Sequence, residues 1–545
     1  MIRSFGRLLL VIGIFLFVPC VSYAKRINVH TLEELMSAAS KRNNIIVVRN
    51  HIDLEKNRVV FVEGCVLRFR SGSFSNGILV GNHTVLKNNR KNVFHDCTIA
   101  GTWQSDYACS SMFNVDMETM QLLRNMSCLS PTMKLSANRN YLINAQQDTI
   151  QVEVIEADGK AKPAIAFHTT APNISGVVLM GRNVTLRNLV ITDDYDEKND
   201  AIYGENKPTI GNTIVVKGPK KVVESLSIEG CEFHGGTSSS WVASSQTKNC
   251  VVENCTFTGY MADHGVYCSM KTESFVVENS TVIDVWHTTG IFKMRTSQDA
   301  KAFIIKNVKA HNLNGYLAHI PLQKTPTCKL LFDKIIVTKD LYNESVFYGF
   351  CINDETNSSF ETGYNAKELI IRDCFFNYGY NGNAVVYSGS GSRAYIETIK
   401  YLSTYFDSSN FGGCFSDNLI VSNCTLNNCC SINKKGIEIM SKYVCINDSK
   451  LSDIANDVNY CLFLINYSRS YVESFVLKDV VIDVNTKHIF NVIHGDNISL
   501  KIESCFFTSV KNAVISAPSH CNVDYNITKS CIESIKPQSV ITFRE

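Results

Sequence analysis

The chain has 545 residues, with 53 basic and 51 acidic side chains and a formal net charge of +2. This near balance argues against a nucleic-acid partner or an acidic membrane surface, because both require concentrated positive charge. The chain is rich in Val, Ile, Phe, Asn, Ser and Thr and contains only 10 Pro, a composition that favours strands.

The first segment has the pattern of a secretory signal. Arg3 and Arg7 precede an apolar run over 8–18, which is too short to cross a bilayer. Ser22-Tyr23-Ala24 is a small-x-small cleavage site. We therefore expect a signal peptide over 1–24 and export to the periplasm, the cell surface or the medium. No later segment has the apolar length of a membrane span.

A small β-helical capping domain is expected over 25–105. Thr31 and Glu34 form a capping-box pattern that predicts a helix over 31–40. The apolar face of this helix would carry Leu32, Leu35 and Met36. Strands are expected to follow at 45–48, 59–62 and 66–69. The tripeptide Gly101-Thr102-Trp103 closes this domain.

The main domain is expected over 106–545 and begins with a second helix. That helix is predicted over 116–126, with its apolar side formed by Met117, Met120, Leu122 and Leu123. Strands are expected next at 133–135 and 141–143. The first helix would cover the open end of the stacked strands, which repeat structures need for solubility. The alternative to two domains is one continuous rod.

One short phrase returns through the rest of the chain. Apolar and polar residues alternate, then comes Asn or Asp, then Cys, Ser or Thr, then another apolar residue. Successive copies place Asn254, Asn279 and Asn307 at steps of 25 (279 − 254) and 28 (307 − 279) residues. Later copies centre on Asp373, Asn423, Asp448, Asp479 and Ser504.

This repeat predicts a parallel β-solenoid. Its period-two alternation indicates strands, and no Asn-Gly or Asp-Gly hairpin turn separates the copies. Units too short to fold alone must then stack as successive coils, with strands about 4.8 Å apart. Residues one period apart would form ladders, among them an Asn ladder that satisfies the backbone of neighbouring turns.

The ladder also explains the cysteines and the glycosylation-like triplets. Five of the 21 Cys occupy the slot after the Asn or Asp, namely Cys231, Cys255, Cys374, Cys424 and Cys505. Export permits disulfides, but the shared slot favours buried free thiols over a disulfide framework. The Asn-x-Ser/Thr triplets could be glycosylation sites; their place in the repeat favours turn chemistry instead.

The phrase resembles the repeat of right-handed parallel β-helix proteins of the pectate-lyase-like superfamily, over residues 27–531. This resemblance implies an all-β fold, a right-handed parallel β-helix with a period of about 25 residues and short N-terminal capping helices. It leaves the activity open, because this architecture hosts lyases, hydrolases, adhesins and inert spacers.

One pair of adjacent coils gathers residues suited to chemistry. With Gly265 aligned over Gly290 and Met294 pointing inward, the side chains of Lys293 and Arg295 project outward. Candidate catalytic residues are Asp263, His264, Lys293 and Arg295. Candidate substrate-binding residues are Trp286, His287, Tyr316 and His319.

This arrangement is similar in part to the polygalacturonase family. His264-Gly265 matches its His-Gly element, and Lys293-Met294-Arg295 matches its basic triplet in reversed order. The paired carboxyl groups that hydrolysis needs are missing, because residues 238–240, one period before Asp263, are serines. The acidic run 193–197 lies 70 residues (264 − 194) before His264. Hydrolysis by this mechanism is therefore not predicted.

A lyase needs fewer groups. His264 or Lys293 would remove the proton beside a uronate carboxylate, which Arg295 would hold. No cofactor is required; the acidic run 193–197 leaves Ca²⁺ open, although it lacks the spacing of a known calcium loop and also fits a solvated acidic loop. The expected function is binding or breakdown of an acidic, uronate-containing polysaccharide. The candidate reaction for the breakdown is β-elimination.

Two non-catalytic functions compete with this one. An adhesin or glycan-binding protein would use aromatic side chains along the coils, for which the candidates are Tyr378, Tyr380, Tyr387, Tyr395, Tyr401, Tyr405 and Phe406. A structural surface rod would have neither aromatic ladders nor a polar cleft.

Overall fold

The protein is described by a computed structural model. It covers residues 24–87, 90–144, 147–168, 175–194, 211–236, 239–260, 263–286, 289–355, 363–377, 385–388, 393–409, 411, 413–428, 436–452, 461–465, 472–492, 497–528 and 539–544. The expected signal peptide lies, except for Ala24, outside these residues. The chain forms two compact units, one ending at Arg139 and the other beginning at Asn140.

The first unit contains a parallel sheet with the strand order β1-β2-β5-β6-β3, and β4 and β7 also pair with β6. Its elements are β1 (Arg26–Val29), α2 (Leu32–Ala39), β2 (Ile45–Val48), β3 (His51–Asp53), β4 (Arg58–Val60), β5 (Val66–Phe69), β6 (Ser73–Lys87), β7 (Phe94–Gln104), β8 (Ala108–Cys109), the 3-10 helix η1 (Ser110–Met112), α3 (Thr119–Leu129) and β9 (Thr132–Leu135).

Helix α2 starts at the predicted cap. The Thr31 hydroxyl accepts a hydrogen bond from the Glu34 N–H (3.3 Å). The Glu34 carboxylate in return accepts from the N–H of His30 (2.7 Å), one residue before the cap. Leu35, Ala38 and Ala39 are buried. Met36 is 47% exposed, so its expected place on the apolar face is wrong.

Helix α3 begins three residues later than expected, because Glu118 caps it. The Glu118 carboxylate accepts from the N–H groups of Met120 (2.8 Å) and Gln121 (2.7 Å). From the helix, Asn125 exchanges hydrogen bonds with the backbone of Cys97 (2.9 Å) and Ile99 (3.0 Å) in β7. The helix therefore packs on the first unit, and the observed division after Arg139 lies later than the expected one after residue 105.

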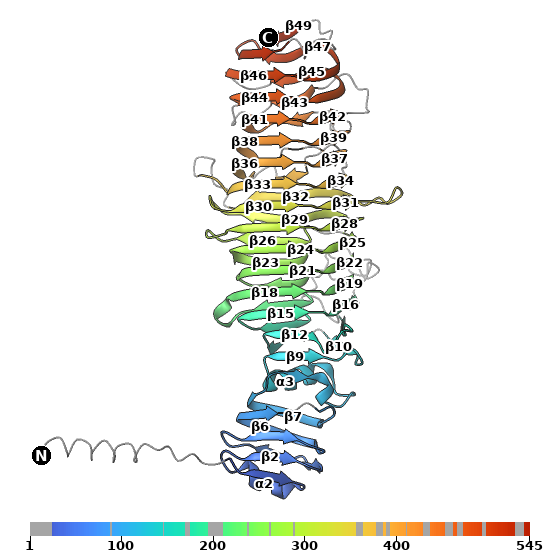
Figure 1. Ribbon diagram of the computed structural model, residues 1–545, viewed down its shortest axis with the longest axis vertical. Helices are drawn as coiled ribbons and strands as arrows, with labels where there is room; N and C mark the ends of the chain where they lie inside the picture. The colour runs from blue at the N-terminus through green and yellow to red at the C-terminus, as the bar shows by residue number, and fades with distance from the viewer. Residues whose placement is uncertain are drawn as a thin grey trace, which may run out of the picture. The chain divides into compact units, whose positions relative to one another are not determined.

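The second unit is a right-handed parallel β-helix with three sheets. Successive strands of the chain visit the sheets in turn, as β21, β22 and β23 do before β24 starts the next coil. Figure 1 shows these strands as successive layers. Each strand is therefore hydrogen-bonded to strands one coil before and one coil after it, and the register between coils decides which side chains meet.

The first sheet of the second unit contains β12 (Val154–Ala157), β15 (Asn183–Arg187), β18 (Val223–Glu229), β21 (Thr247–Glu253), β24 (Ser274–Glu278), β27 (Ala302–Lys306), β30 (Lys329–Asp333), β33 (Ala366–Arg372), β36 (Tyr395–Leu402), β38 (Phe415–Ser422), β41 (Ser441–Asn447), β44 (Ser474–Lys478), β46 (Asn497–Glu503) and β48 (Asn522–Ile527).

The second sheet contains β10 (Tyr141–Asn144), β13 (Ala164–His168), β16 (Val190–Asp194), β19 (Glu232–Gly236), β22 (Thr256–Tyr260), β25 (Thr281–Trp286), β28 (Lys309–His311), β31 (Ile336–Thr338), β34 (Phe375–Asn377), β37 (Tyr405–Asp407), β39 (Thr425–Asn427), β40 (Ile437–Glu438), β42 (Lys450–Ser452), β43 (Cys461–Ile465), β45 (Val481–Val492), β47 (Phe506–Pro518) and β49 (Ser539–Arg544).

The third sheet contains β11 (Asp148–Gln151), β14 (Val177–Met180), β17 (Ile214–Lys217), β20 (Ser240–Ser244), β23 (His264–Thr272), β26 (Phe292–Thr296), β29 (Gly315–Leu322), β32 (Phe347–Asp354) and β35 (Val386–Tyr387). A short 3-10 helix, η2 (Pro219–Lys221), precedes β18.

The repeated Asn or Asp turns the chain between the first and second sheets. The residues of this slot have φ of 48–55°, the left-handed region that Asn and Asp tolerate best: Asn188, Asn254, Asn279, Asn307, Lys334, Asp373, Ser403, Asn423, Asp448, Asp479 and Ser504. The predicted ladder is present, since the Asn307 side-chain amide donates to Asn279 Oδ1 (2.7 Å).

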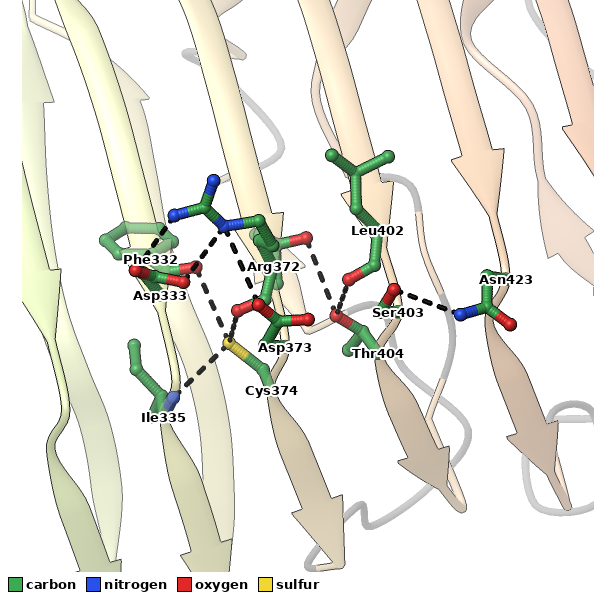
Figure 2. Close-up of polar contacts among 11 residues, drawn as sticks. Phe332, Asp333, Ile335, Arg372, Asp373, Cys374, Leu402, Ser403, Thr404 and Asn423 are labelled. Atoms are coloured by element: carbon green, nitrogen blue, oxygen red, sulfur yellow. Dashed lines mark hydrogen bonds and ion pairs between the residues drawn. The ribbon is translucent and has the colours of Figure 1, made fainter.

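The next slot fills the interior of the turn. Figure 2 shows the Cys374 thiol against the carbonyls of Phe332 (3.5 Å) and Arg372 (3.2 Å), while Thr404 donates to the Leu402 carbonyl (2.9 Å) one coil later. The five cysteines of this slot are buried free thiols, as the ladder interpretation predicts. Stacked aromatic rings complete the core, for example Phe233 on Phe257 with centroids 5.0 Å apart.

Candidate functional site

The candidate residues meet on the third sheet, on strands β23, β26 and β29. There Tyr267 is paired with Lys293, and Lys293 is paired with His319. Met294 is fully buried, as predicted, so the chain around it presents Lys293 and Arg295 away from the core. We call Tyr267, Lys293, Arg295 and His319 the basic strip.

The register of this strip differs by one residue from the sequence alignment. Val266 pairs with Phe292, an offset of 26 (292 − 266), whereas Gly265 over Gly290 requires 25. The extra residue enters in β25, where the pairing with β22 shifts after Thr258 and Asp284 has φ of 50°. This β-bulge places Tyr267, rather than Cys268, beside Lys293.

Lys293 is the most enclosed cation of the strip. Its side chain is only 9% exposed, and its ammonium lies 5.0 Å from the centroid of the Tyr267 ring. Burial lowers the pKa of Lys293, and the nearby Asp263 carboxylate partly opposes this effect. None of the ion pairs between described residues includes Lys293, so the amine is held mainly by the ring and by its neighbours on the sheet.

His264 is fully buried, which contradicts its expected role as an exposed base. Its Nδ1 bonds to the Gly290 carbonyl (2.8 Å), and its ring lies 5.0 Å from that of Tyr267. Asp263 Oδ1 is 3.0 Å from His264 Nε2 but outside hydrogen-bonding geometry. Burial and the charge of Lys293 lower the pKa of His264 to about 3. In the described structure His264 therefore has no exposed surface with which a ligand could make contact.

His319 lies next to Lys293 on β29 and is partly exposed. Within the described residues its Nδ1 is buried and has no hydrogen-bond partner. Burial, followed by the charge of Lys293, lowers its pKa to about 4. Gly290 makes room for this histidine: a Cβ at Gly290 would lie 2.7 Å from the Cβ of His319.

Arg295 joins the strip to a pocket of about 460 Å³ at the edge of the sheet. The other residues of the pocket wall are polar except for Met270: Lys271, Thr296, Ser297, Gln298, Asp299, Gln323 and Glu355. Arg295 Nε lies 3.5 Å from a Glu355 oxygen, with the Arg295 side chain 42% exposed. The volume falls within the range of about 300–1,000 Å³ of small-ligand sites, but the wall is more polar than the mainly apolar lining of such sites.

Tyrosines continue along the sheet beyond the strip. The ring of Tyr316 lies 5.7 Å from Tyr348 and stacks with Tyr387 at 6.0 Å. Tyr348 is 49% and Tyr387 43% exposed, while burial raises the pKa of Tyr316. Tyr316 thus lies among aromatic groups, and its role in substrate binding stays a prediction.

Of the two remaining candidates, only Trp286 is described, and it does not join the strip. Trp286 ends β25 on the second sheet and is 36% exposed. His287 lies outside the described residues. The sequence did not identify three residues near the strip. Tyr267 was missed because the one-residue bulge changes the alignment, and Tyr348 and Glu355 were missed because they lie outside the repeat copies.

The expected aromatic groove is only partly present. Tyr401 and Phe406 are fully buried in the core, so their expected surface role is wrong. Tyr378 and Tyr380 lie outside the described residues. Tyr395 instead donates to Asp417 on the first sheet, together with Tyr364. The sequence could not distinguish inward from outward rings where loops interrupt the period.

The acidic run 193–197 is described only as far as residue 194. Asp193 is 8% exposed and accepts a hydrogen bond from the Thr213 hydroxyl (3.0 Å). Over the described ranges, no three His, Cys, Asp or Glu side chains come together in a way that could hold a metal ion. No helix there is long and apolar enough to span a membrane.

Comparisons with known proteins identify no family. None of the family models matches the chain, and none of the curated proteins does. Among solved structures, the chain is similar to one titled "Structure of PL6 family alginate lyase AlyGC", at 10% identity, 95% coverage of this chain and 100% of that chain, with a TM-score of 0.19.

Proposed function

We propose that the protein is exported and binds an acidic, uronate-containing polysaccharide along the third sheet of its second unit. The observation that carries the proposal is the register of Tyr267, Lys293 and His319 on adjacent strands, with Arg295 joining them to the pocket of about 460 Å³. Adjacent strands are about 4.8 Å apart, so a polymer lying across them would meet a new side chain at each coil.

The two basic side chains on β26 indicate that the ligand is acidic. Lys293 and Arg295 point to the same side of the strand, and a carboxylate that approaches them gains charge-assisted hydrogen bonds. Arg295 is already near Glu355, which holds the guanidinium in place without enclosing it. A uronate carboxylate would use the open side of this guanidinium.

The exposed aromatic rings indicate that the ligand is a sugar rather than a simple anion. Tyr348 and Tyr387 expose large ring surfaces on the same sheet, and such rings combine an apolar face with a polar hydroxyl. The hydroxyl and amide groups of Ser297, Gln298 and Gln323 in the pocket suit the hydroxyls of a saccharide.

Cleavage by β-elimination is the second candidate, and the enclosed Lys293 favours it. Its lowered pKa increases the fraction of neutral amine, which can act as a base. The amine would take the proton from C5 of a uronate, the electron pair would form the C4–C5 double bond, and the glycosidic oxygen would leave C4 and take a proton from solvent water, after which the ammonium returns its proton to solvent. Arg295 would neutralise the carboxylate as charge develops on it.

The test combines binding and cleavage with matched variants. The mature chain is titrated with alginate, polygalacturonate and glucuronate-containing polysaccharides and with a neutral glucan, and unsaturated products are followed by ultraviolet absorbance. Lys293→Ala and Arg295→Ala should each weaken binding roughly tenfold or more. Lys306→Ala, which removes an exposed lysine from the first sheet, serves as the control and should leave binding unchanged.

The outcomes separate the alternatives. If the polysaccharide binds in a way that depends on Lys293 but no ultraviolet absorbance develops, the protein is a glycan-binding protein. Absorbance that Lys293→Ala abolishes supports a lyase. No binding to any acidic polymer, or equal losses in Lys293→Ala and Lys306→Ala, would contradict the proposal and leave the structural-rod alternative.

A further inference from the structure

A second pocket lies entirely within the first unit. It has a volume of about 890 Å³ and is lined by Arg68, Val85, Leu86, Lys87, Trp103, Gln104, Ser105, Asp106, Tyr107, Leu129 and Pro131. Trp103, the last residue of the tripeptide Gly101-Thr102-Trp103 that ends the expected capping domain, thus lines a cavity that the proposed function does not use.

We propose that this pocket is a separate binding site for an acidic saccharide, with Arg68 and Lys87 holding the anionic group. Arg68 on β5 and Lys87 on β6 are direct partners in register, and both are exposed. Like charges directly opposite each other on adjacent strands are destabilising. Among the described residues neither cation forms an ion pair, so an anionic ligand bound between them would relieve this repulsion.

Trp103 gives the pocket a fixed aromatic wall. Its indole N–H donates to the Ala100 carbonyl (2.8 Å), and its ring packs edge-on against Phe61 at 5.4 Å. Gly81 makes room for the ring, because a Cβ there would lie 2.6 Å from it. Trp103 is therefore held in one orientation before any ligand arrives, which lowers the entropy cost of binding.

Tyr107 and Asp106 complete the site for a sugar. The Lys134 ammonium lies 4.6 Å from the centroid of the Tyr107 ring and adds positive charge nearby. The Asp106 carboxylate, also in the pocket wall, can accept hydrogen bonds from saccharide hydroxyls. An anion-binding pair, an acceptor for hydroxyls and two aromatic rings fit an acidic saccharide better than an inorganic anion, which would need only the cations.

The experiment uses the full mature chain with Lys293→Ala and Arg295→Ala, so that the basic strip contributes as little as possible. Uronate oligosaccharides, sulfated oligosaccharides, a neutral oligosaccharide and inorganic sulfate are titrated against it. Adding Arg68→Gln or Lys87→Gln should weaken binding of the acidic oligosaccharides roughly tenfold. Trp103→Phe should remove a ligand-induced change in tryptophan fluorescence, and Arg58→Gln on β4 is the exposed control.

The two kinds of acidic oligosaccharide distinguish a carboxylate ligand from a sulfate ester, and preference for either supports the site. Three results would overturn it: no binding of any acidic oligosaccharide, binding of inorganic sulfate as tight as that of the oligosaccharides, or equal losses in Arg58→Gln and Lys87→Gln. Thermal unfolding of each variant shows whether a loss reflects the site or the fold. Because Lys293 and Arg295 are both replaced in the tested chain, the binding measured at this pocket does not depend on the proposed function of the basic strip.

Discussion

The buried His264 should make the stability of the second unit fall as the pH is lowered. Its pKa is about 3 in the folded protein, against an ordinary value of 6.5 for a histidine, because burial and the charge of Lys293 disfavour the imidazolium. The unfolded chain then binds more protons than the folded one below pH 6.5, so stability is full above that value and is lost as the pH falls toward 3.

The size of this effect follows from the two pKa values. Lowering the pH from 7 to 4.5 should cost about 2 to 3 kcal/mol through His264 alone, because one pKa unit corresponds to about 1.4 kcal/mol. Asp263, 3.0 Å from Nε2, faces the same ring and limits the loss, and His319 adds a loss of the same sign. The variant His264→Asn retains a donor for the Gly290 carbonyl but cannot titrate in this range.

The assay is denaturant unfolding of both proteins at pH 7 and at pH 4.5. The free energy of unfolding of the natural chain should fall by about 2 to 3 kcal/mol more than that of His264→Asn. An equal fall in the two proteins would show that His264 is not buried as a neutral ring, and a smaller fall in the natural chain would mean that it is buried as an imidazolium paired with Asp263.

Three further predictions concern a glycine beside the site and two positions in the repeated turn of the β-helix. Gly290→Ala should cost about 1 to 3 kcal/mol of stability, since its φ is 153° and the added Cβ meets His319; unchanged unfolding would refute the close approach. Asn279→Ala should destabilise the chain by about 1 kcal/mol and Asn279→Gly by less, because only the alanine is strained at φ of 51°; the reverse order in thermal unfolding would contradict this. Cys374→Ser should cost about 1 kcal/mol or less, since Thr404 fills the same slot, and reductant should leave the melting temperature unchanged; a large shift with reductant would indicate a disulfide.

The period of the sequence was sufficient to predict the fold because a ladder constrains every coil. Residues such as Asn254 and Asn279 must adopt the same left-handed turn, so their spacing directly reports the coil length. Lys334 and Ser403 adopt the same left-handed turn. These copies were harder to recognise because lysine and serine, unlike asparagine, are not typical of that conformation.

The site was harder to predict than the fold for two physical reasons. A bulge at Asp284 adds one residue between coils, and nothing in the local sequence marks it, so Lys293 was aligned with the wrong partner. The burial of a side chain at a sheet edge depends on how the neighbouring loops fold over it, which period-two alternation in the sequence does not predict. His264 and Lys293 were therefore expected at the surface, whereas both are buried; the inward direction of Met294 did follow from the alternation.

The most direct test of the central claim is a crystal structure of the mature chain with a uronate oligosaccharide. The account predicts that the sugar lies across β23, β26 and β29, with a carboxylate at Lys293 or Arg295 and a sugar ring against a tyrosine of the same sheet. Oligosaccharide bound in the second unit only on the first or second sheet, with the third sheet empty, would contradict the account.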